Sequence, residues 1–543
     1  MSVSSRCGTG WPCALLLIAA FLCTSNPHAR AQSEATNSSP CDPRAAEPKA
    51  SLGAPLLSPP QPPLDLEAIK QMIREELKAE KARQDEEDRN KKAQPPWLGI
   101  SKDLKLSASV SDGFTAETAD KAFRFHFGGR LEFDNAWFTQ NNNLLIGSSS
   151  TTRLEDGTDF RRARLRADGL LWEWIEFVAE VNFANIQDVA NVNNQTVPVG
   201  SVGLTNCYLT FCDLPVVGNV RVGHFKAPTG LDRYTSANYQ YYMERSSLFD
   251  AFLDPDQYQS GLLLFNSYLD DRVTAATSFT RVNHGTLNSF GFDTQDGLYA
   301  VGLRLTGLPI YQDDGRVLMH LGFDYFHHAL TGHTFAVGNR MPLRAGGGSD
   351  EIPDLLATGN FFTPNGVDVV DFEWAFVYGP FAMSAEYALA RATDVFESFN
   401  GVNFAGPRGN VTYQAFYVES GYFLTPGDRR RYDKKTGTWD RTVPQENAFV
   451  KRGEDGRWCH GSGAVQLVAR YTYLDLVSGS PPLTPTSGGA RAGTEQDVTL
   501  GVNWYLNPQT IISLNYVWTH LDSVVAGASG NLQGLGIRFH VDF

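Results

Sequence analysis

Rows of arginine are the first feature of this chain that could do chemistry. Arg124 and Arg130 lie six residues apart, and Arg162, Arg164 and Arg166 follow one another at a spacing of two. On a β-strand these even spacings place the side chains on one face, with nearest neighbours about 7 Å apart. A guanidinium group binds anionic oxygens in pairs and keeps its charge at physiological pH. The spacing therefore predicts a wall of fixed positive charges that attracts anions.

The residues around these arginines alternate between apolar and polar side chains. From 123 to 137 the odd positions are almost all aromatic or aliphatic, and the even positions carry the charges. A period of two is typical of a β-strand with one apolar and one charged face. The same alternation returns near the end of the chain, with the apolar set Leu535, Ile537, Phe539, Val541 and Phe543.

Alternating segments of this kind fill most of the chain without intervening helices. Because the apolar faces are rich in Phe, Tyr and Trp and the chain starts with an export signal, the pattern favours an all-β transmembrane antiparallel β-barrel over a soluble sandwich. About sixteen strands would enclose an aqueous lumen that side chains alone cannot fill, so loops must narrow it. The predicted strands are 123–138, 160–171, 175–185, 203–212, 218–226, 259–268, 272–282, 297–308, 315–328, 367–378, 381–391, 411–424, 463–475, 496–506, 510–520 and 533–543.

The connections between the predicted strands are alternately short and long, as they are in outer-membrane barrels. Residues 227–258 and 329–366 are long connections. Residues 425–462 break the alternation, because they are long but fall on the side of the short turns. Either a pair of strands is missed there or the segment folds into the lumen. The basic residues between 428 and 457 would then form a periplasmic vestibule, and the alternative is a solvated linker.

Four segments precede the predicted barrel of residues 123–543. Residues 1–31 have the short apolar core and the Ala-Arg-Ala end of a secretory signal peptide. Residues 32–63 form a linker rich in Pro, Ser and Ala. Apolar residues at steps of three and four predict a periplasmic helix or short coiled coil over residues 64–94. Residues 95–122 lead into the barrel.

The composition disfavours several classes of function. The chain has 46 Lys and Arg against 60 Asp and Glu, a formal net charge of −14, which opposes binding to nucleic acid. Only Cys207, Cys212 and Cys459 fall within the predicted barrel, too few for a disulfide scaffold or a zinc site. No G-x-S-x-G elbow or His–Ser pairing is present. We therefore expect no enzymatic activity, no metal and no cofactor.

Six stretches occur in an order that is itself informative: GGRLEFD (128–134), FRRARL (160–165), VGHFKAP (222–228), YMERS (242–246), YFLTP (422–426) and ARYTYLD (469–475). In this order they resemble the phosphate-selective porin family, named for the porins O and P. The resemblance covers most of residues 110–543.

This resemblance implies a homotrimer of sixteen-stranded barrels in the bacterial outer membrane, with a ladder of arginines that guides anions. It also implies loops folded inward, here 227–258, 329–366 and 425–462. Arg130 and the pair Arg161-Arg162 match the family's phosphate-binding arginines. The constriction would hold Lys226, Arg233 and Arg245, and the neighbouring hydroxyls that the family places near the anion would be Thr235 and Ser236.

The sequence thus predicts an outer-membrane channel for passive uptake of small anions, phosphate above all, through an arginine-lined pore. The alternative is a weakly selective general porin with a structural helix that faces peptidoglycan, because Glu132 and Glu180 share the lumenal faces with the arginines. Expected partners are small inorganic anions, outer-membrane lipid and further copies of the chain. The barrel-assembly machinery is expected to recognise the strand that ends in Phe543.

Overall fold

A computed structural model describes the barrel and part of the helix that precedes it. Residues 71 and 74–83 are helical and fall within the predicted helix of residues 64–94. The predicted signal peptide (1–31) and linker (32–63) lie outside the described residues. No helix among the described residues is long and apolar enough to cross a membrane. The described ranges are 71, 74–83, 104–109, 113–145, 154–184, 189–192, 195–198, 202–253, 258–281, 299–328, 333–344, 354–399, 404–448, 450–452, 458–478, 492–524 and 527–543.

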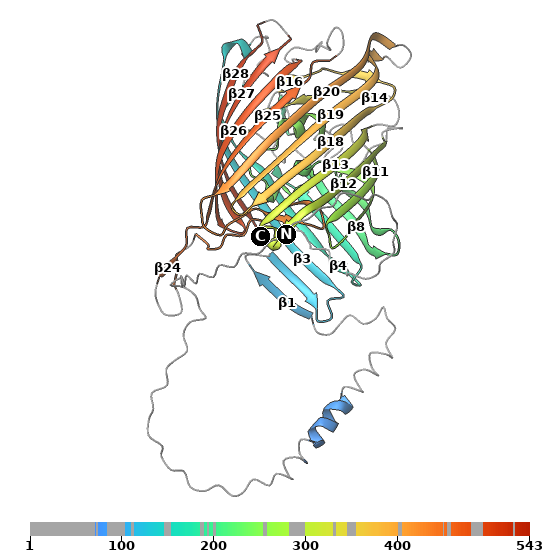
Figure 1. Cartoon of the computed structure of the whole chain (residues 1–543), viewed down its shortest axis with the longest axis vertical. Helices are drawn as coiled ribbons and strands as arrows, with labels where there is room; N and C mark the ends of the chain where they lie inside the picture. Colours follow the sequence, from blue (N-terminus) through green and yellow to red (C-terminus); the bar gives the residue numbers. More distant parts are fainter. Residues whose placement is uncertain are drawn as a thin grey trace, which may run out of the picture.

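Sixteen of the described strands close into an antiparallel barrel, because the last of them pairs back onto the first (Figure 1). Closure leaves no open edge, as the hydrocarbon of a bilayer requires. Each of the sixteen predicted segments overlaps one of these strands, so the predicted barrel is confirmed. The strands are β3 (Arg124–Gln140), β4 (Gly157–Leu171), β5 (Ile175–Asn182), β8 (Gly203–Leu214), β9 (Gly218–Lys226), β10 (Tyr258–Tyr268), β11 (Val273–Arg281), β12 (Tyr299–Gln312), β13 (Val317–His328), β18 (Val367–Tyr378), β19 (Phe381–Phe399), β20 (Phe404–Phe423), β25 (Ala464–Asp475), β26 (Gly493–Asn507), β27 (Thr510–Ser523) and β28 (Gly530–Asp542).

The barrel wall reverses the burial pattern of a soluble protein. On β3 the charged Glu132 and Asp134 are fully buried, whereas Leu131 next to them is 43% exposed. On β28, Arg538 is buried while Phe539 is exposed. Apolar side chains therefore face outward, where lipid surrounds them, and polar side chains face the lumen.

Aromatic side chains gather at the rim that carries the short turns. Trp172 and Trp174 lie in the turn between β4 and β5, and Tyr378 and Tyr422 lie at the ends of β18 and β20; all four are exposed. Belts of this kind lie at the interface between membrane and water. Since short turns face the periplasm in such barrels, this rim is the periplasmic one and the rim with the long connections is the outer one.

Short strands and helices lie in the lead-in segment and in the connections between the barrel strands. β1 (Leu104–Ser109) and β2 (Gly113–Thr118) form a hairpin in the lead-in segment, and β2 pairs with the start of β3. Figure 1 shows this hairpin beyond the end of the barrel. The other short elements lie in the connections: η1 (Asn142–Leu145), β6 (Val189–Val192), β7 (Gln195–Pro198), α2 (Leu231–Tyr234), η4 (Ala237–Tyr239), η5 (Phe249–Leu253), η7 (Asp313–Gly315), β14 (His333–Phe335), β15 (Gly338–Asn339), β16 (Leu356–Ala357), β17 (Phe361–Thr363), β21 (Arg431–Asp433), β22 (Thr438–Asp440), β23 (Val450–Arg452) and β24 (Trp458–His460).

The connection from β9 to β10, residues 227–257, folds into the lumen and is called the β9–β10 loop. Its described part contains α2, η4 and η5 and is almost entirely buried. Leu248 and Leu253 are at most 2% exposed and belong to a hydrophobic cluster with Val369 and Ala388 of the wall. The core of this protein therefore lies inside the barrel, between the loop and the strands.

Two further connections enter the lumen. In the β13–β18 loop (residues 329–366), Met341 and Leu343 are fully buried. In the β20–β25 segment (residues 424–463), Trp439 is 3% exposed and clusters with Tyr241 and Tyr242 of the β9–β10 loop. The described residues of that segment contain only short strands, so no transmembrane pair is missing there. Residues 428–442 enter the lumen from the periplasmic side and do not form a solvated linker.

A glycine in β9 gives a test of the strand packing. The φ angle of Gly223 is +137°, and a Cβ atom added there would lie 2.3 Å from the carbonyl oxygen of Cys207. We expect Gly223→Ala to destabilise the barrel by about 1–3 kcal/mol, measured as a lower midpoint of thermal unfolding in detergent. Gly307→Ala is the control, because a Cβ on Gly307 of β12 meets no atom within 4 Å. Equal midpoints for both variants would contradict this packing.

Candidate functional site

A polar cavity of about 270 Å³ lies between the β9–β10 loop and the wall formed by β3, β4, β5, β8 and β9. Seven basic side chains line it, against three acidic ones. The basic residues are Arg130, Arg162, Arg164, Arg166, Arg221, Lys226 and Arg245, and the acidic residues are Glu176, Glu180 and Asp542. The cavity is therefore locally positive although the whole chain is acidic.

Strand register brings the predicted arginine rows together. Arg130 of β3 lies directly opposite Arg164 of β4, and Arg162 lies opposite Glu132. The register shifts next to this pair, since Phe133 is opposite Phe160 and Arg161 has no counterpart on β3. Arg161 thus occupies a β-bulge, which frees its side chain from the strict alternation of the strand.

Acidic neighbours neutralise part of the arginine row. Arg162 lies 2.5 Å from Glu132, Arg164 lies 3.1 Å from Glu180, and Arg166 lies 2.8 Å from Asp168. Each pair is mostly buried, so its attraction is screened less than that of a surface pair. Pairing orients the guanidinium groups and limits the net charge that they present to the cavity.

The cations nearest the loop have mainly neutral hydrogen-bond acceptors. Lys226 donates from Nζ to the carbonyl oxygen of Thr235 at 3.2 Å. Arg245 donates to the carbonyl oxygens of Asp232 and Thr235, both at 2.9 Å, and the carboxylate of Asp232 is 3.7 Å away. Carbonyl acceptors fix these side chains in place without cancelling their charge.

Three contributors to the cavity were missed from the sequence. Arg221 of β9 lies 3.9 Å from the centre of the Tyr208 ring and 3.7 Å from Glu176. It alternates with Val220 and Val222, so the same period-two rule would have found it. Asn238 accepts a hydrogen bond from Arg130, and Tyr258 lies 3.2 Å from Arg164. No local sequence signal identifies these two, because the fold of the loop brings Asn238 to the wall and strand pairing places Tyr258, the first residue of β10, near Arg164.

Four predicted site residues do not line this cavity, and their role in anion passage stays a prediction. Arg124 is about 20 Å along β3 from Arg130 and lies opposite Leu170. Arg233 is 1% exposed and donates to the hydroxyl of Thr229 on the apolar side of α2. Arg161 and Thr235 bind protein groups at the edge of the site. Of the predicted set, Arg130, Arg162, Arg164, Arg166, Lys226, Ser236 and Arg245 do line the cavity.

The bulged Arg161 anchors the β9–β10 loop. It donates from Nε and Nη2 to the two oxygens of Glu244, at 2.7 and 3.0 Å. Arg538 of β28 reaches the same carboxylate at 3.0 Å. Burial alone would raise the pKa of Glu244, but the positive charges of Arg161, Arg344 and Arg162 outweigh it and hold this pKa well below its ordinary value. Glu244 therefore remains ionised and joins the loop to β4 and β28.

Comparison with known proteins places this architecture in a family. The profile described as "Phosphate-selective porin O and P" matches residues 131–543. The chain belongs to this family. Its members are channels of the bacterial outer membrane, which is therefore the location of this protein, and the family indicates a channel rather than an enzyme.

Individual relatives are distant in sequence. Porin O of Pseudomonas aeruginosa is 23% identical over 435 residues, which cover 76% of this chain and 86% of that protein. An uncharacterized protein of Caulobacter vibrioides is 26% identical over 395 residues, covering 71% of this chain and 67% of that protein. Among solved structures, an anion-selective porin from Comamonas acidovorans matches with a TM-score of 0.42 and 10% identity, over 77% of this chain and 99% of that one.

In this porin two of the three inward connections, the β9–β10 loop and the β20–β25 segment, meet at one buried arginine. Arg430 of the β20–β25 segment lies 3.3 Å from the ring centre of Tyr241 and 4.2 Å from that of Trp439. It also donates to the carbonyl oxygen of Tyr239 at 3.3 Å. Because Tyr241 and Tyr239 belong to the β9–β10 loop, this guanidinium joins the outer loop to the periplasmic segment. The guanidinium of Arg430 thus packs between the rings of Tyr241 and Trp439 inside the lumen.

The ion pairs of Glu244 predict a defined acid sensitivity. Since the folded protein lowers the pKa of Glu244, its contribution to stability is complete above the ordinary glutamate pKa of about 4.3 and is lost as pH falls through the lowered value. We expect Glu244→Gln to reduce stability at pH 7 by about 3 kcal/mol. The difference from wild type should persist to pH 5 and shrink below that. Thermal unfolding across this pH range measures it, with Glu173→Gln in the exposed β4–β5 turn as control.

Arg430 gives a second test, of the contact between the β20–β25 segment and the β9–β10 loop inside the lumen. Arg430→Ala removes two cation–π contacts, each of about 0.5–2 kcal/mol, and should loosen the β20–β25 segment from the β9–β10 loop. Single-channel conductance in a planar bilayer is expected to rise. Arg429→Ala is the matched control, because Arg429 pairs with Asp314 at the rim. An unchanged conductance in Arg430→Ala would show that the contact does not hold the lumen closed.

Proposed function

We propose that this porin is a passive channel for small anions, with phosphate as its preferred substrate, and that the cavity beside the β9–β10 loop is its selective region. The observation that carries the proposal is the excess of seven basic over three acidic side chains around one small lumenal cavity. Family membership supports the same function. The relation to Porin O of Pseudomonas aeruginosa also supports this function, and the description of the family names phosphate as the selected solute.

The geometry of the cavity suits an oxyanion. Guanidinium groups of Arg130, Arg164 and Arg166 approach it from β3 and β4, Lys226 approaches it from the end of β9, and Arg245 approaches it from the loop. An anion between these two sides would exchange water for charge-assisted hydrogen bonds without moving any backbone. Because the wall arginines are also bound to carboxylates, each binds the anion only moderately. Moderate binding at successive positions permits passage, as conduction requires.

A second candidate function is a weakly selective general porin. The close pairs of Arg162 with Glu132 and Arg166 with Asp168 favour it, because paired charges create a transverse field more than a net positive path. The two functions differ in which ion carries the current. They are therefore separated by selectivity and not by conductance.

We propose the assembly and partners that belong with this function. The family resemblance supports a homotrimer, and the exposed apolar wall supports contact with outer-membrane lipid. Recognition of β28 by the barrel-assembly machinery remains part of the same proposal. The predicted periplasmic helix of residues 64–94 would serve as a spacer or register the trimer.

The zero-current potential under a KCl gradient tests the wild-type function. A potential near that of chloride, together with block of the chloride current by added phosphate, is the expected result. A potential near zero or toward that of potassium would reject the anion channel in favour of the general porin.

Variants then test the site. We expect Arg130→Ala combined with Arg162→Ala to move the zero-current potential away from chloride and to weaken phosphate block by about tenfold or more, equivalent to 1.4 kcal/mol. The control pair is Arg391→Ala with Arg408→Ala on β19 and β20, neither of which lines the cavity. Lys226→Gln, compared with Lys121→Gln in the exposed turn before β3, gives the same test without removing partners of buried carboxylates. Equal effects of site and control variants would show that the arginine row does not set selectivity.

A further inference from the structure

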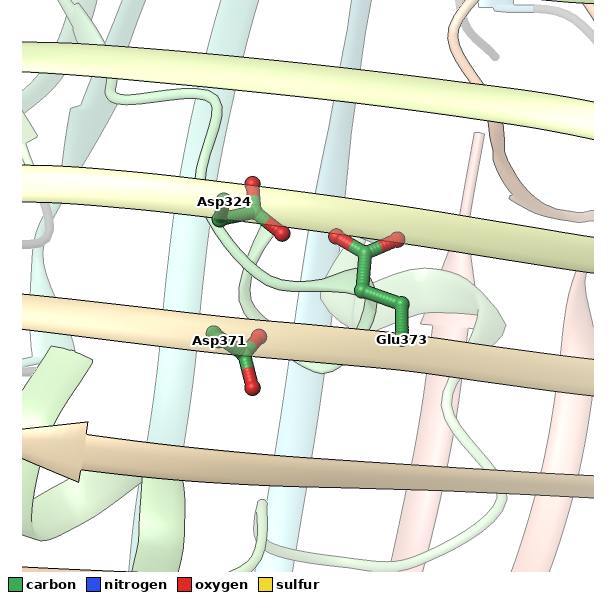
Figure 2. A group of neighbouring side chains, drawn as sticks. All are labelled: Asp324, Asp371 and Glu373. Atoms are coloured by element: carbon green, nitrogen blue, oxygen red, sulfur yellow. The ribbon is translucent and has the colours of Figure 1, made fainter.

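A second group of ionisable side chains lies on the wall opposite the basic row. Asp324 of β13 and Asp371 and Glu373 of β18 each offer an oxygen, and these three oxygens lie within 4.8 Å of one another. Figure 2 shows the carboxylate of Asp324 on β13 and that of Glu373 on β18 directed toward each other, with Asp371 beside Glu373 on β18. All three side chains are at most 3% exposed.

The strand register forces these acids into contact. Asp324 lies directly opposite Asp371, and Glu373 lies directly opposite Glu386 of β19. Like charges at directly opposite positions of a sheet are destabilising. Two such pairs side by side, away from water, need compensation from a positive charge or from protons.

Neighbouring hydrogen-bond donors bind the carboxylates of Glu373 and Glu386 but not those of Asp324 and Asp371. Glu373 accepts from Arg304 at 2.8 and 2.7 Å and contacts His320 at 2.8 Å. Glu386 accepts from the first backbone amides of α2 and from the hydroxyl of Tyr417. In contrast, none of the four carboxylate oxygens of Asp324 and Asp371 has a hydrogen-bond partner among the described residues.

The count of charged groups also shows an excess of negative charge in this cluster. Four buried carboxylates face the single guanidinium of Arg304, which contacts Glu373 and lies 3.6 Å from Asp324. Arg304 therefore offsets one negative charge and is held in place by carbonyl oxygens of Thr436 and Gly437. The remaining excess of negative charge coincides with the two carboxylates that lack partners.

We propose that Asp324, Asp371 and Glu373 bind a divalent cation, Ca²⁺ by its chemistry, inside the barrel wall. Carboxylate oxygens from three side chains match the ligands of a hard cation, and Ca²⁺ accepts the irregular geometry that two adjacent strands impose. Further oxygens would come from backbone carbonyls or water. Gly322 makes room for this arrangement, because a Cβ there would lie 2.5 Å from Oε2 of Glu373.

Such a cation would stabilise the β9–β10 loop. Glu386 holds the start of α2, and Asp371 approaches the same backbone, since a Cβ on Gly230 would lie 3.5 Å from its Oδ2. Binding of Ca²⁺ removes the repulsion that the triad exerts on Glu386. It also reduces the negative charge around Arg304. This side chain donates to the carbonyl oxygen of Thr436, a residue that lines the basic cavity. The inference is independent of which solute the channel prefers.

The experiment uses the full-length porin, purified in detergent free of lipopolysaccharide and treated with EDTA. Titration with CaCl₂ in a calorimeter is expected to show one site per chain, with a dissociation constant below about 1 mM. Thermal unfolding is expected to shift upward in CaCl₂ relative to EDTA. Asp371→Asn and, separately, Asp324→Asn should lose both the heat of binding and the shift.

The matched control is Asp368→Asn, which changes the same residue type on the same strand. Asp368 is bound by Tyr325 and His327, and its side chain is 42% exposed, so this variant should keep the response to CaCl₂. Wild-type protein that binds no Ca²⁺ would overturn the proposal, and a rise in its stability on acidification would show that protons compensate the cluster. Binding that survives both Asp371→Asn and Asp324→Asn would also overturn it, because the cation would then lie elsewhere.

Discussion

A strand that crosses a bilayer must find every backbone hydrogen-bond partner within the protein, because hydrocarbon offers none. In this porin that requirement is met by pairing of β28 with β3, which leaves the barrel without an edge. Closure then dictates the side-chain pattern, since each strand has one face in lipid and one in the lumen. The alternation of Leu131 with Glu132 and of Phe539 with Arg538 is the direct result. It also fixes where charge can be placed, namely on the inner wall.

Charges confined to an inner wall must be balanced over short distances. Glu132 illustrates this balance, because it contacts Arg162 at 2.5 Å, Arg538 at 3.4 Å and His540 at 3.4 Å. The neighbouring row of arginines therefore forms a network of ion pairs. Its net positive charge is smaller than the number of its arginines would suggest. The positive excess includes Lys226 at the end of β9 and Arg245 of the β9–β10 loop, whose hydrogen bonds go to carbonyl groups. Overall charge says little about such a site, because electrostatic interactions are screened within about 8–10 Å in salt.

A barrel of sixteen strands is too wide for its own side chains to fill, so the lumen is narrowed by folded connections. The β9–β10 loop is held to the wall at two places, by Glu244 with Arg161 and Arg538 and by α2 with Glu386. It is also held to the β13–β18 loop, because Asp250 pairs with Arg340 and Arg344. The β20–β25 segment then packs on the loop through Arg430. The basic cavity and the acidic cluster of Asp324, Asp371 and Glu373 lie on different strands of the wall, and the loop contacts both through Arg245 and α2.

The sequence by itself determined the barrel, because a period of two requires only that lipid and water lie on opposite sides of each strand. All sixteen predicted segments overlap observed strands, and the predicted row of Arg162, Arg164 and Arg166 lines the cavity. Tertiary structure alone decided which cations share that cavity. Arg161 lies at the edge of the site because of a bulge that depends on the pairing of β4 with β3. Arg233 lies on the apolar side of α2. The spacing of residues in the sequence predicts neither position. Likewise the meeting of Asp324 with Asp371 depends on the register between β13 and β18, which join across a long loop. Local periodicity sets which face a side chain occupies, whereas contacts between distant segments depend on how loops close and strands register, and a linear sequence does not display either.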